Sequence, residues 1–184
     1  MINLMGPFMF RNLFIFLAFS INSFNVLAAP SMYQVLSEGE YQTPISVMKQ
    51  LEANKGDMIV AFDMEIEADE LIYEFVIVNL VKQQLIETRI RAKDGAKLKD
   101  SSKTIAADDL DQVQAVKMLQ RKQLSFSDLV SMAMKDKPGF LLEAELDHDL
   151  AISYLELKLL TEMSKHTVAF DIDNLRPLPL LKWD

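Results

Sequence analysis

Residues 125–147, SFSDLVSMAMKDKPGFLLEAELD, contain the pattern that decides the predicted fold. Ser125, with Asp128 three residues later, is a capping signal for the start of a helix. An apolar face follows at helical spacing, formed by Phe126, Leu129, Val130, Ala133 and Met134. Lys137-Pro138-Gly139 ends the helix, and the next residues alternate between apolar and acidic side chains. We therefore expect a helix followed directly by a two-faced strand.

The same order of elements occurs earlier in the chain. Thr43 followed by Pro44 predicts a helix start, and Lys55-Gly56-Asp57 predicts its end. Three strands are predicted after this helix, at residues 58–67, 72–78 and 85–91, before a turn at Asp94-Gly95. Two further strands are predicted after residue 147, at residues 155–159 and 168–173.

A shift of 82 residues superposes the two series without a gap. It lays Thr43 on Ser125 and Glu74 on Glu156, and every predicted buried face falls on a buried face. Because a slip of one residue would turn a strand inside out, this agreement indicates a duplicated unit. The alternative is one mixed domain whose halves are similar by chance. We predict an α+β fold with two tandem units, each a helix packed on an antiparallel sheet of about three strands.

The N-terminal segment has the pattern of a secretory signal. Arg11 precedes the apolar residues 13–19, and Val26 and Ala28 fit the −3 and −1 positions of a cleavage site. An uncleaved membrane anchor is the alternative, and only in that case would the protein contact a membrane. Export of a bacterial protein to the periplasm or the medium is the prediction.

The predicted organisation has five parts. A connecting helix is expected because Ser101-Ser102-Lys103 is a polar break and Asp108 begins a helical pattern that ends near Gln123. The parts are a signal peptide at 1–28, a polar lead-in at 29–40, repeat 1 at 41–100, the connecting helix at 101–123 and repeat 2 at 124–184.

Composition excludes several classes of function. The 184 residues include 19 Lys and Arg against 27 Asp and Glu, a net charge of −8, which disfavours a nucleic-acid partner. The absence of Cys excludes disulfides, thiolate metal sites and cysteine nucleophiles. The chain has two His, and it has no nucleophile elbow, glycine-rich phosphate loop or zinc-protease motif. We therefore predict no enzymatic activity and no cofactor.

The second repeat resembles the PepSY domain, a small extracytoplasmic module of bacterial secreted and membrane proteins. The resemblance rests on a helix, then Lys137-Pro138-Gly139, the acidic strand at 143–146, the strand Tyr154-Leu155-Glu156-Leu157 and the final strand Phe170-Asp171-Ile172-Asp173. The first repeat matches less closely, through Gly56, residues 73–76 and Asp94-Gly95. The resemblance implies tandem PepSY-like units and a noncatalytic binding module that regulates or inhibits a secreted or membrane peptidase.

The polar face of the second sheet is the candidate binding surface. Strand alternation places six carboxylates on one side, with Lys158 as the nearby base: Glu143, Glu145, Asp147, Glu156, Asp171 and Asp173. A water-facing surface kept soluble by charge is the simpler interpretation. The interaction hypothesis is that this face, or a sheet edge, binds another extracytoplasmic protein, such as a peptidase.

The alternative function is a periplasmic sensor or carrier of a metal ion or small ligand, suggested by Asp147-His148-Asp149. These residues fall in a predicted turn, where polar side chains are ordinary, so we assign no metal site. The oligomeric state, the partner and the relative orientation of the repeats do not follow from the sequence.

Overall fold

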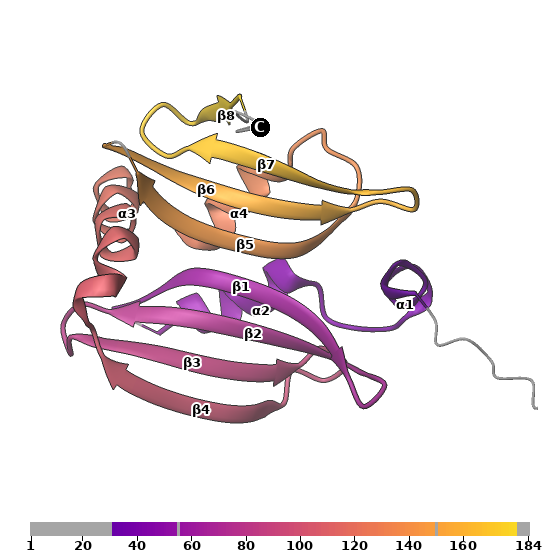
Figure 1. Cartoon of the computed structure of the whole chain (residues 1–184). Helices are drawn as coiled ribbons and strands as arrows, with labels where there is room; N and C mark the ends of the chain where they lie inside the picture. Colours follow the sequence, from indigo (N-terminus) through magenta and orange to yellow (C-terminus); the bar gives the residue numbers. More distant parts are fainter. Residues whose placement is uncertain (1–30, 55, 150, 180–184) are drawn as a thin grey trace, which may run out of the picture.

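The computed structural model describes residues 31–54, 56–149 and 151–179, which contain one eight-stranded antiparallel sheet (Figure 1). The strand order is β4-β3-β2-β1-β5-β6-β7-β8, so β1 and β5 meet in the middle. The strands are β1 (Asp57–Glu67), β2 (Glu70–Asn79), β3 (Gln84–Arg91), β4 (Lys97–Thr104), β5 (Phe140–Asp149), β6 (Ile152–Leu160), β7 (Lys165–Asp171) and β8 (Arg176–Leu178). The helices are α1 (Met32–Glu38), α2 (Pro44–Glu52), α3 (Leu110–Lys122) and α4 (Phe126–Met134), with a 3-10 turn η1 (Ala107–Asp109) before α3.

The predicted fold class is wrong, because the strands do not form two separate sheets of about three strands. β1 pairs with β5 at the centre, and β4 and β8 add a fourth strand to each half. This central pairing satisfies backbone groups that two separate sheets would leave at open edges. The sequence could not reveal the pairing, since both halves carry the same alternating pattern. Alternation assigns side chains to faces but does not identify the strand that pairs with each edge.

One face of the sheet, which we call the inner face, is covered by α2 and α4 (Figure 1). Its buried side chains include Phe62, Phe75 and Leu157, and they form a single apolar cluster with residues of both helices. The ring of Phe62 lies 5.2 Å from that of Phe75, centre to centre. The two halves therefore share one core. The opposite face, which we call the outer face, carries most of the charged strand residues.

The helix starts follow the predicted capping signals. The Thr43 side chain accepts a hydrogen bond from the Ser46 N–H, and Pro44 is the first residue of α2. Ser125 caps α4 and forms a reciprocal capping box with Asp128. Each such cap stabilises a helix by about 1 kcal/mol. The predicted starts of α2 and α4 are confirmed.

Residues 82 apart lie at corresponding places in the two halves of the sheet. Phe62 and Ala144 are such a pair, and they face each other directly across β1 and β5. Both strands also have an irregular register at the same relative position, between Ile59 and Ala61 in β1 and between Leu141 and Glu143 in β5. The halves are thus arranged around the Phe62–Ala144 pair as if related by a two-fold axis.

The gapless superposition is wrong for the third strand. Phe75 pairs with Thr88, whereas its counterpart Leu157 pairs with Val168, so the offset there is 80 residues. The two connecting loops have the same length, but β6 and β7 each end one residue earlier at this hairpin than β2 and β3 do. Because the difference is an even number of residues, each side chain keeps its face of the sheet.

Three elements have no counterpart in the prediction. Ser101-Ser102-Lys103, predicted as a polar break, lies inside β4, and the predicted lead-in contains α1. β4 is an edge strand with almost entirely exposed side chains, so it has no apolar alternation to detect. β8 has only three residues. The connecting helix exists, but its N-cap is Asp109 rather than Asp108.

The predicted signal peptide at 1–28 lies outside the described residues. Within the described residues, no helix has the length and apolar character needed to cross a membrane.

Candidate functional site

A shallow hollow of about 260 Å³ lies on the outer face where β1 meets β5, and we call it the seam hollow. Its base includes Ala61 and the main chain at Ala144, and Val76 lies on one side. Gln112 of α3 closes one end, where its amide donates a 3.1 Å hydrogen bond to the Glu145 carboxylate. Ala61 lies on the outer face opposite Glu145, and its small side chain leaves space that a larger one would fill. Both halves of the sheet thus contribute to one concave surface.

Carboxylates surround the seam hollow. They are Asp63, Glu74, Glu143, Glu145 and Glu156, and Lys158 is the only basic residue in the lining. The Lys158 ammonium forms an ion pair with Glu143 at 2.5 Å. Among the described residues, Asp63, Glu145 and Glu156 have no ion-pair partner. The hollow therefore presents a net negative charge around a partly apolar floor.

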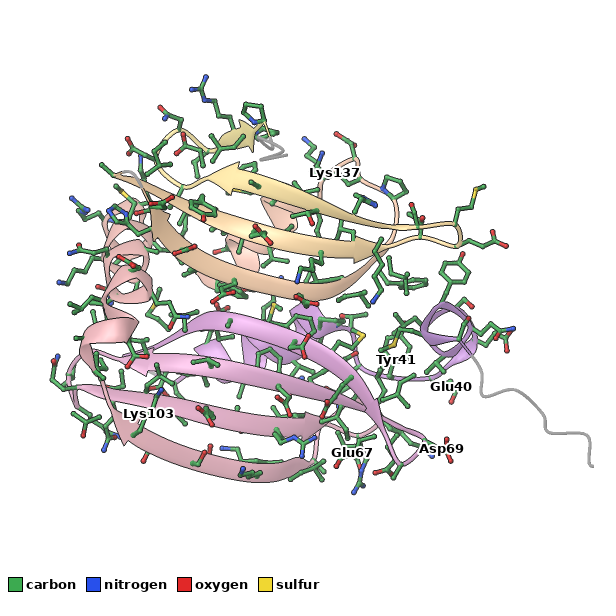
Figure 2. All side chains as sticks on the ribbon, in the orientation of Figure 1. Glu40, Tyr41, Glu67, Asp69, Lys103 and Lys137 are labelled. Atoms are coloured by element: carbon green, nitrogen blue, oxygen red, sulfur yellow. The ribbon has the colours of Figure 1, made fainter. Side chains whose placement is uncertain are left out.

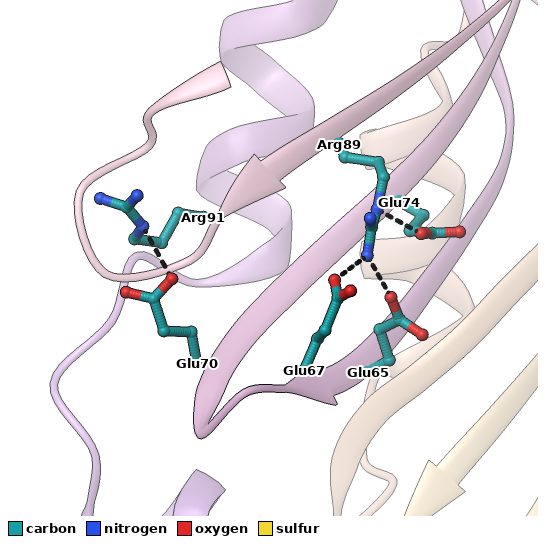
Figure 3. Close-up of polar contacts among 6 residues, drawn as sticks. All are labelled: Glu65, Glu67, Glu70, Glu74, Arg89 and Arg91. Atoms are coloured by element: carbon teal, nitrogen blue, oxygen red, sulfur yellow. Dashed lines mark hydrogen bonds and ion pairs between the residues drawn. The ribbon is translucent and has the colours of Figure 1, made fainter. Parts of the chain in front are cut away.

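Two arginines partly compensate the carboxylates on the neighbouring outer face of the first half. The Arg89 guanidinium contacts Glu65, Glu67 and Glu74, with 2.6 Å between its Nε and the Glu74 carboxylate (Figure 3). Arg91 pairs with Glu70 at 3.3 Å and with Asp94 at 3.1 Å. These cross-strand contacts place a cation beside several acids of the first half, whereas Asp63, Glu145 and Glu156 at the seam have no such contact among the described residues.

The crowding of carboxylates in the hollow shifts the pKa values of the groups around it. Partial burial raises the pKa of Asp63, and the nearby Glu143 and Glu65 carboxylates raise it further. Burial also raises the pKa of Glu74, with Glu65 adding to the effect and Arg89 opposing it. The Glu143 carboxylate raises the pKa of the Lys158 ammonium. A positively charged group entering the hollow would relieve the repulsion among these carboxylates.

Of the six predicted site residues, the structure brings Glu143, Glu145 and Glu156 together in the seam hollow. The other three lie apart from it with partners of their own. Asp147 accepts a 2.8 Å hydrogen bond from the Tyr154 hydroxyl. Asp171 is buried and accepts hydrogen bonds from Asn174 and from the Asp173 N–H. Asp173 pairs with Lys122 at 3.0 Å.

Sequence reasoning missed the contribution of Asp63 and Glu74 to this site. Alternation places both on the polar face of their strands, which is correct. Their closeness to Glu143 and Glu156 depends on the β1–β5 pairing. No local signal in the sequence specifies that pairing.

Asp147-His148-Asp149 lies at the end of β5 rather than in a turn. His148 Nδ1 lies 2.8 Å from the hydroxyl of Ser153, which is buried. In the described part of the chain, no group of three or more His, Asp or Glu side chains is placed to hold a metal ion.

Comparison with known proteins identifies no family. No family model matches the chain, and no curated protein matches it. Among solved structures it is similar to a "putative lipoprotein" from Clostridium difficile 630, at 18% identity, with a TM-score of 0.44 over 78% of this chain and 95% of that one. A likeness at this level supports no conclusion about fold or function, so the PepSY resemblance stays a prediction.

Proposed function

We propose that this chain is a noncatalytic, extracytoplasmic binding protein whose seam hollow receives a basic segment of another protein. The observation that carries the proposal is the uncompensated acidic lining of the hollow. Asp63, Glu145 and Glu156 lie around an open space on a face that α2 and α4 leave uncovered. Charge complementarity of this kind speeds association and selects partners.

The shape of the hollow favours a side chain with a long apolar stem and a cationic head. Ala61 and Val76 offer apolar contacts to the methylene groups of Lys or Arg, while the carboxylates reach the charge. An Arg guanidinium could bind one carboxylate with two parallel hydrogen bonds. We expect the partner to present at least one such residue on an exposed segment.

The compartment and the partner class rest on the sequence. The N-terminal signal places the protein in the periplasm or outside the cell, and the PepSY resemblance makes a secreted or membrane peptidase the first partner to test. On this proposal the protein regulates the peptidase by occupying or covering a basic surface on it.

The test begins with capture of partners by residues 29–184 from an extracytoplasmic extract, followed by affinity measurements with each identified partner. The test variant is Glu145→Gln with Glu156→Gln. The control is Glu38→Gln with Glu162→Gln, which makes the same change in net charge at exposed positions away from the hollow.

We expect the test variant to weaken binding about tenfold and to reduce its salt dependence, with the control close to the original protein. Equal affinities for all three proteins would overturn the proposed site. Binding lost equally in both variants would show that only net charge matters, which also contradicts a specific hollow.

A further inference from the structure

A second concavity, which we call the apolar pocket, lies between α1, α2, α4 and the ends of β1 and β5 that adjoin them. It has a volume of about 210 Å³. Leu36, Met64, Met134, Phe140 and Leu141 line most of it. Tyr41, labelled in Figure 2 beside α1, adds its ring. The pocket shares no lining residue with the seam hollow.

The two side-chain oxygens of the lining already take part in hydrogen bonds within the protein. The Tyr41 hydroxyl donates a 2.6 Å hydrogen bond to the Leu36 carbonyl, and Thr43 Oγ1 accepts from the Ser46 N–H. An ordered water needs two to four polar partners, so this space holds water poorly. An apolar group entering it would lose little hydration and would gain dispersion contacts with the surrounding side chains.

The other half of the molecule shows which group fits. Thr43 and Ser125 are corresponding N-caps, so Phe126 stands where Pro44 stands in the first half. Phe126 is fully buried in the core, whereas Pro44 is half-buried and lines the pocket. The second half therefore fills the corresponding place with a benzyl group of its own, and the first half leaves it open.

We infer that the apolar pocket is a binding site for one apolar aromatic ring, supplied by a small aromatic molecule or by a Phe side chain of a bound peptide. A cavity of about 150 Å³ with comparable lining is enough for benzene, so this pocket accommodates a ring with a short substituent. The inference is independent of the seam hollow and of the function proposed for it.

The first test uses the unmodified protein with its methionine methyl groups labelled with ¹³C and toluene as the probe. Met64 and Met134 line the pocket, whereas Met58 and Met118 stand at the positions that correspond to the lining residues Phe140 and Leu36. We expect toluene to shift the Met64 and Met134 signals and to leave Met58 and Met118 in place. Absence of a saturable shift, or equal shifts at all four, would overturn the inference.

The second test asks whether the site prefers an apolar ring. Phenol has nearly the shape of toluene but brings a hydroxyl that loses hydration against the mainly apolar lining, so we expect it to bind at least about fivefold more weakly. Binding of phenol as tight as that of toluene would contradict an apolar site.

The third test fills the pocket. Pro44→Phe copies the residue of the second half and should abolish toluene binding while the protein remains folded. Undiminished binding to folded Pro44→Phe would overturn the assignment of the site. If this variant does not fold, the methionine signals of the unmodified protein still show whether toluene binds in the apolar pocket.

A further experiment with peptides distinguishes the two sources of the ring, a free aromatic molecule and a Phe side chain of a bound peptide. Acetyl-Gly-Phe-Gly-amide is compared with acetyl-Gly-Ala-Gly-amide at the same methionine signals. Shifts with the Phe peptide as well as with toluene identify a pocket for a partner's side chain, and shifts with toluene alone identify a pocket for a free aromatic molecule. Shifts with neither refute both forms of the inference.

Discussion

The two halves of the sheet share one framework and differ in the charge of their outer faces. Arg89 and Arg91 of β3 lie beside Glu74 and Ile72 of β2. In the second half the corresponding positions, beside Glu156 and Tyr154 of β6, hold Ala169 and Asp171. Two positions on the third strand thus decide whether the neighbouring acids have a cationic partner.

This difference explains why the seam hollow is asymmetric. Glu74 and Glu156 are equivalent in the sheet. Arg89 forms an ion pair with Glu74, whereas Ala169 stands at the corresponding place beside Glu156. The second half also has a filled core at Phe126, whereas the first half has the apolar pocket beside Pro44. The duplicated framework supplies stability, and the positions where the halves differ supply candidate binding sites.

The largest expected effect on stability comes from the difference between the buried Phe126 and its half-buried counterpart Pro44. Phe126→Ala should lower the free energy of unfolding by about 3–5 kcal/mol, because it empties a fully buried ring site. Pro44→Ala should cost less than about 1 kcal/mol, since it mainly adds freedom to the unfolded chain. Chemical denaturation at neutral pH measures both. Similar losses for the two variants would show that the halves are not packed differently here.

Asp171 is expected to matter more for stability than its counterpart Arg91. Burial opposes ionisation of Asp171, but hydrogen bonds from Asn174 and from the Asp173 N–H outweigh it and hold the pKa below its usual value. Asp171→Ala should therefore cost about 1–3 kcal/mol at neutral pH.

The pH dependence of this effect has a definite sign. A carboxyl with a depressed pKa stabilises the fold above its ordinary pKa of about 3.8, and this contribution is lost as the pH falls through the depressed value. The stability difference between the original protein and Asp171→Ala should shrink in strong acid. A difference that grows on acidification would contradict the assigned hydrogen bonds.

Arg89→Ala should make the first half resemble the second. It frees Glu65, Glu67 and Glu74 from their shared cation, so the seam hollow becomes more negative (Figure 3). We expect tighter, more salt-sensitive binding of a basic partner, measured by calorimetry at two salt concentrations. Arg121→Ala, which removes the same charge from an exposed residue of α3, is the control. Weaker binding by Arg89→Ala than by the control would refute the electrostatic account.

The smallest expected effect is at Asp63, whose raised pKa means that ionisation is disfavoured in the folded state. Its stabilising contribution is present below the ordinary pKa of about 3.8 and is lost as the pH rises through the raised value. Asp63→Asn should therefore raise the melting temperature at pH 7 by about 1–2 °C. The gain should vanish near pH 3. Glu162→Gln, an exposed control, should show no such pattern.

Local structure could be predicted where a local signal exists. Thr43-Pro44 and the Ser125–Asp128 box specify helix starts, and strand alternation assigned Glu143 and Glu145 to the polar face. β4 escaped prediction because both of its faces are exposed and its order comes from backbone pairing with β3.

The site could be predicted only in part for a related reason. Glu143, Glu145 and Glu156 come from adjacent strands of one half, whereas Asp63 and Glu74 reach the hollow through a pairing between distant segments. Asp171 shares the parity of the acidic face, yet it is buried with its own hydrogen-bond partners. Alternation specifies a face, and pairing and burial decide which residues of that face meet.

The measurement that tests the account most directly is a cross-link across the seam, which the Cys-free sequence makes simple to interpret. Ala61 and Glu145 are directly opposite on β1 and β5, and opposed residues of antiparallel strands have the Cα separation that a disulfide needs, about 4.5–5.5 Å. Ala61→Cys with Glu145→Cys should oxidise to an intramolecular disulfide in the folded protein. Ala61→Cys with Asp147→Cys, two residues further along β5, should not. Free thiols in the first pair, or equal cross-linking of both pairs, would contradict the single sheet and the seam hollow built on it.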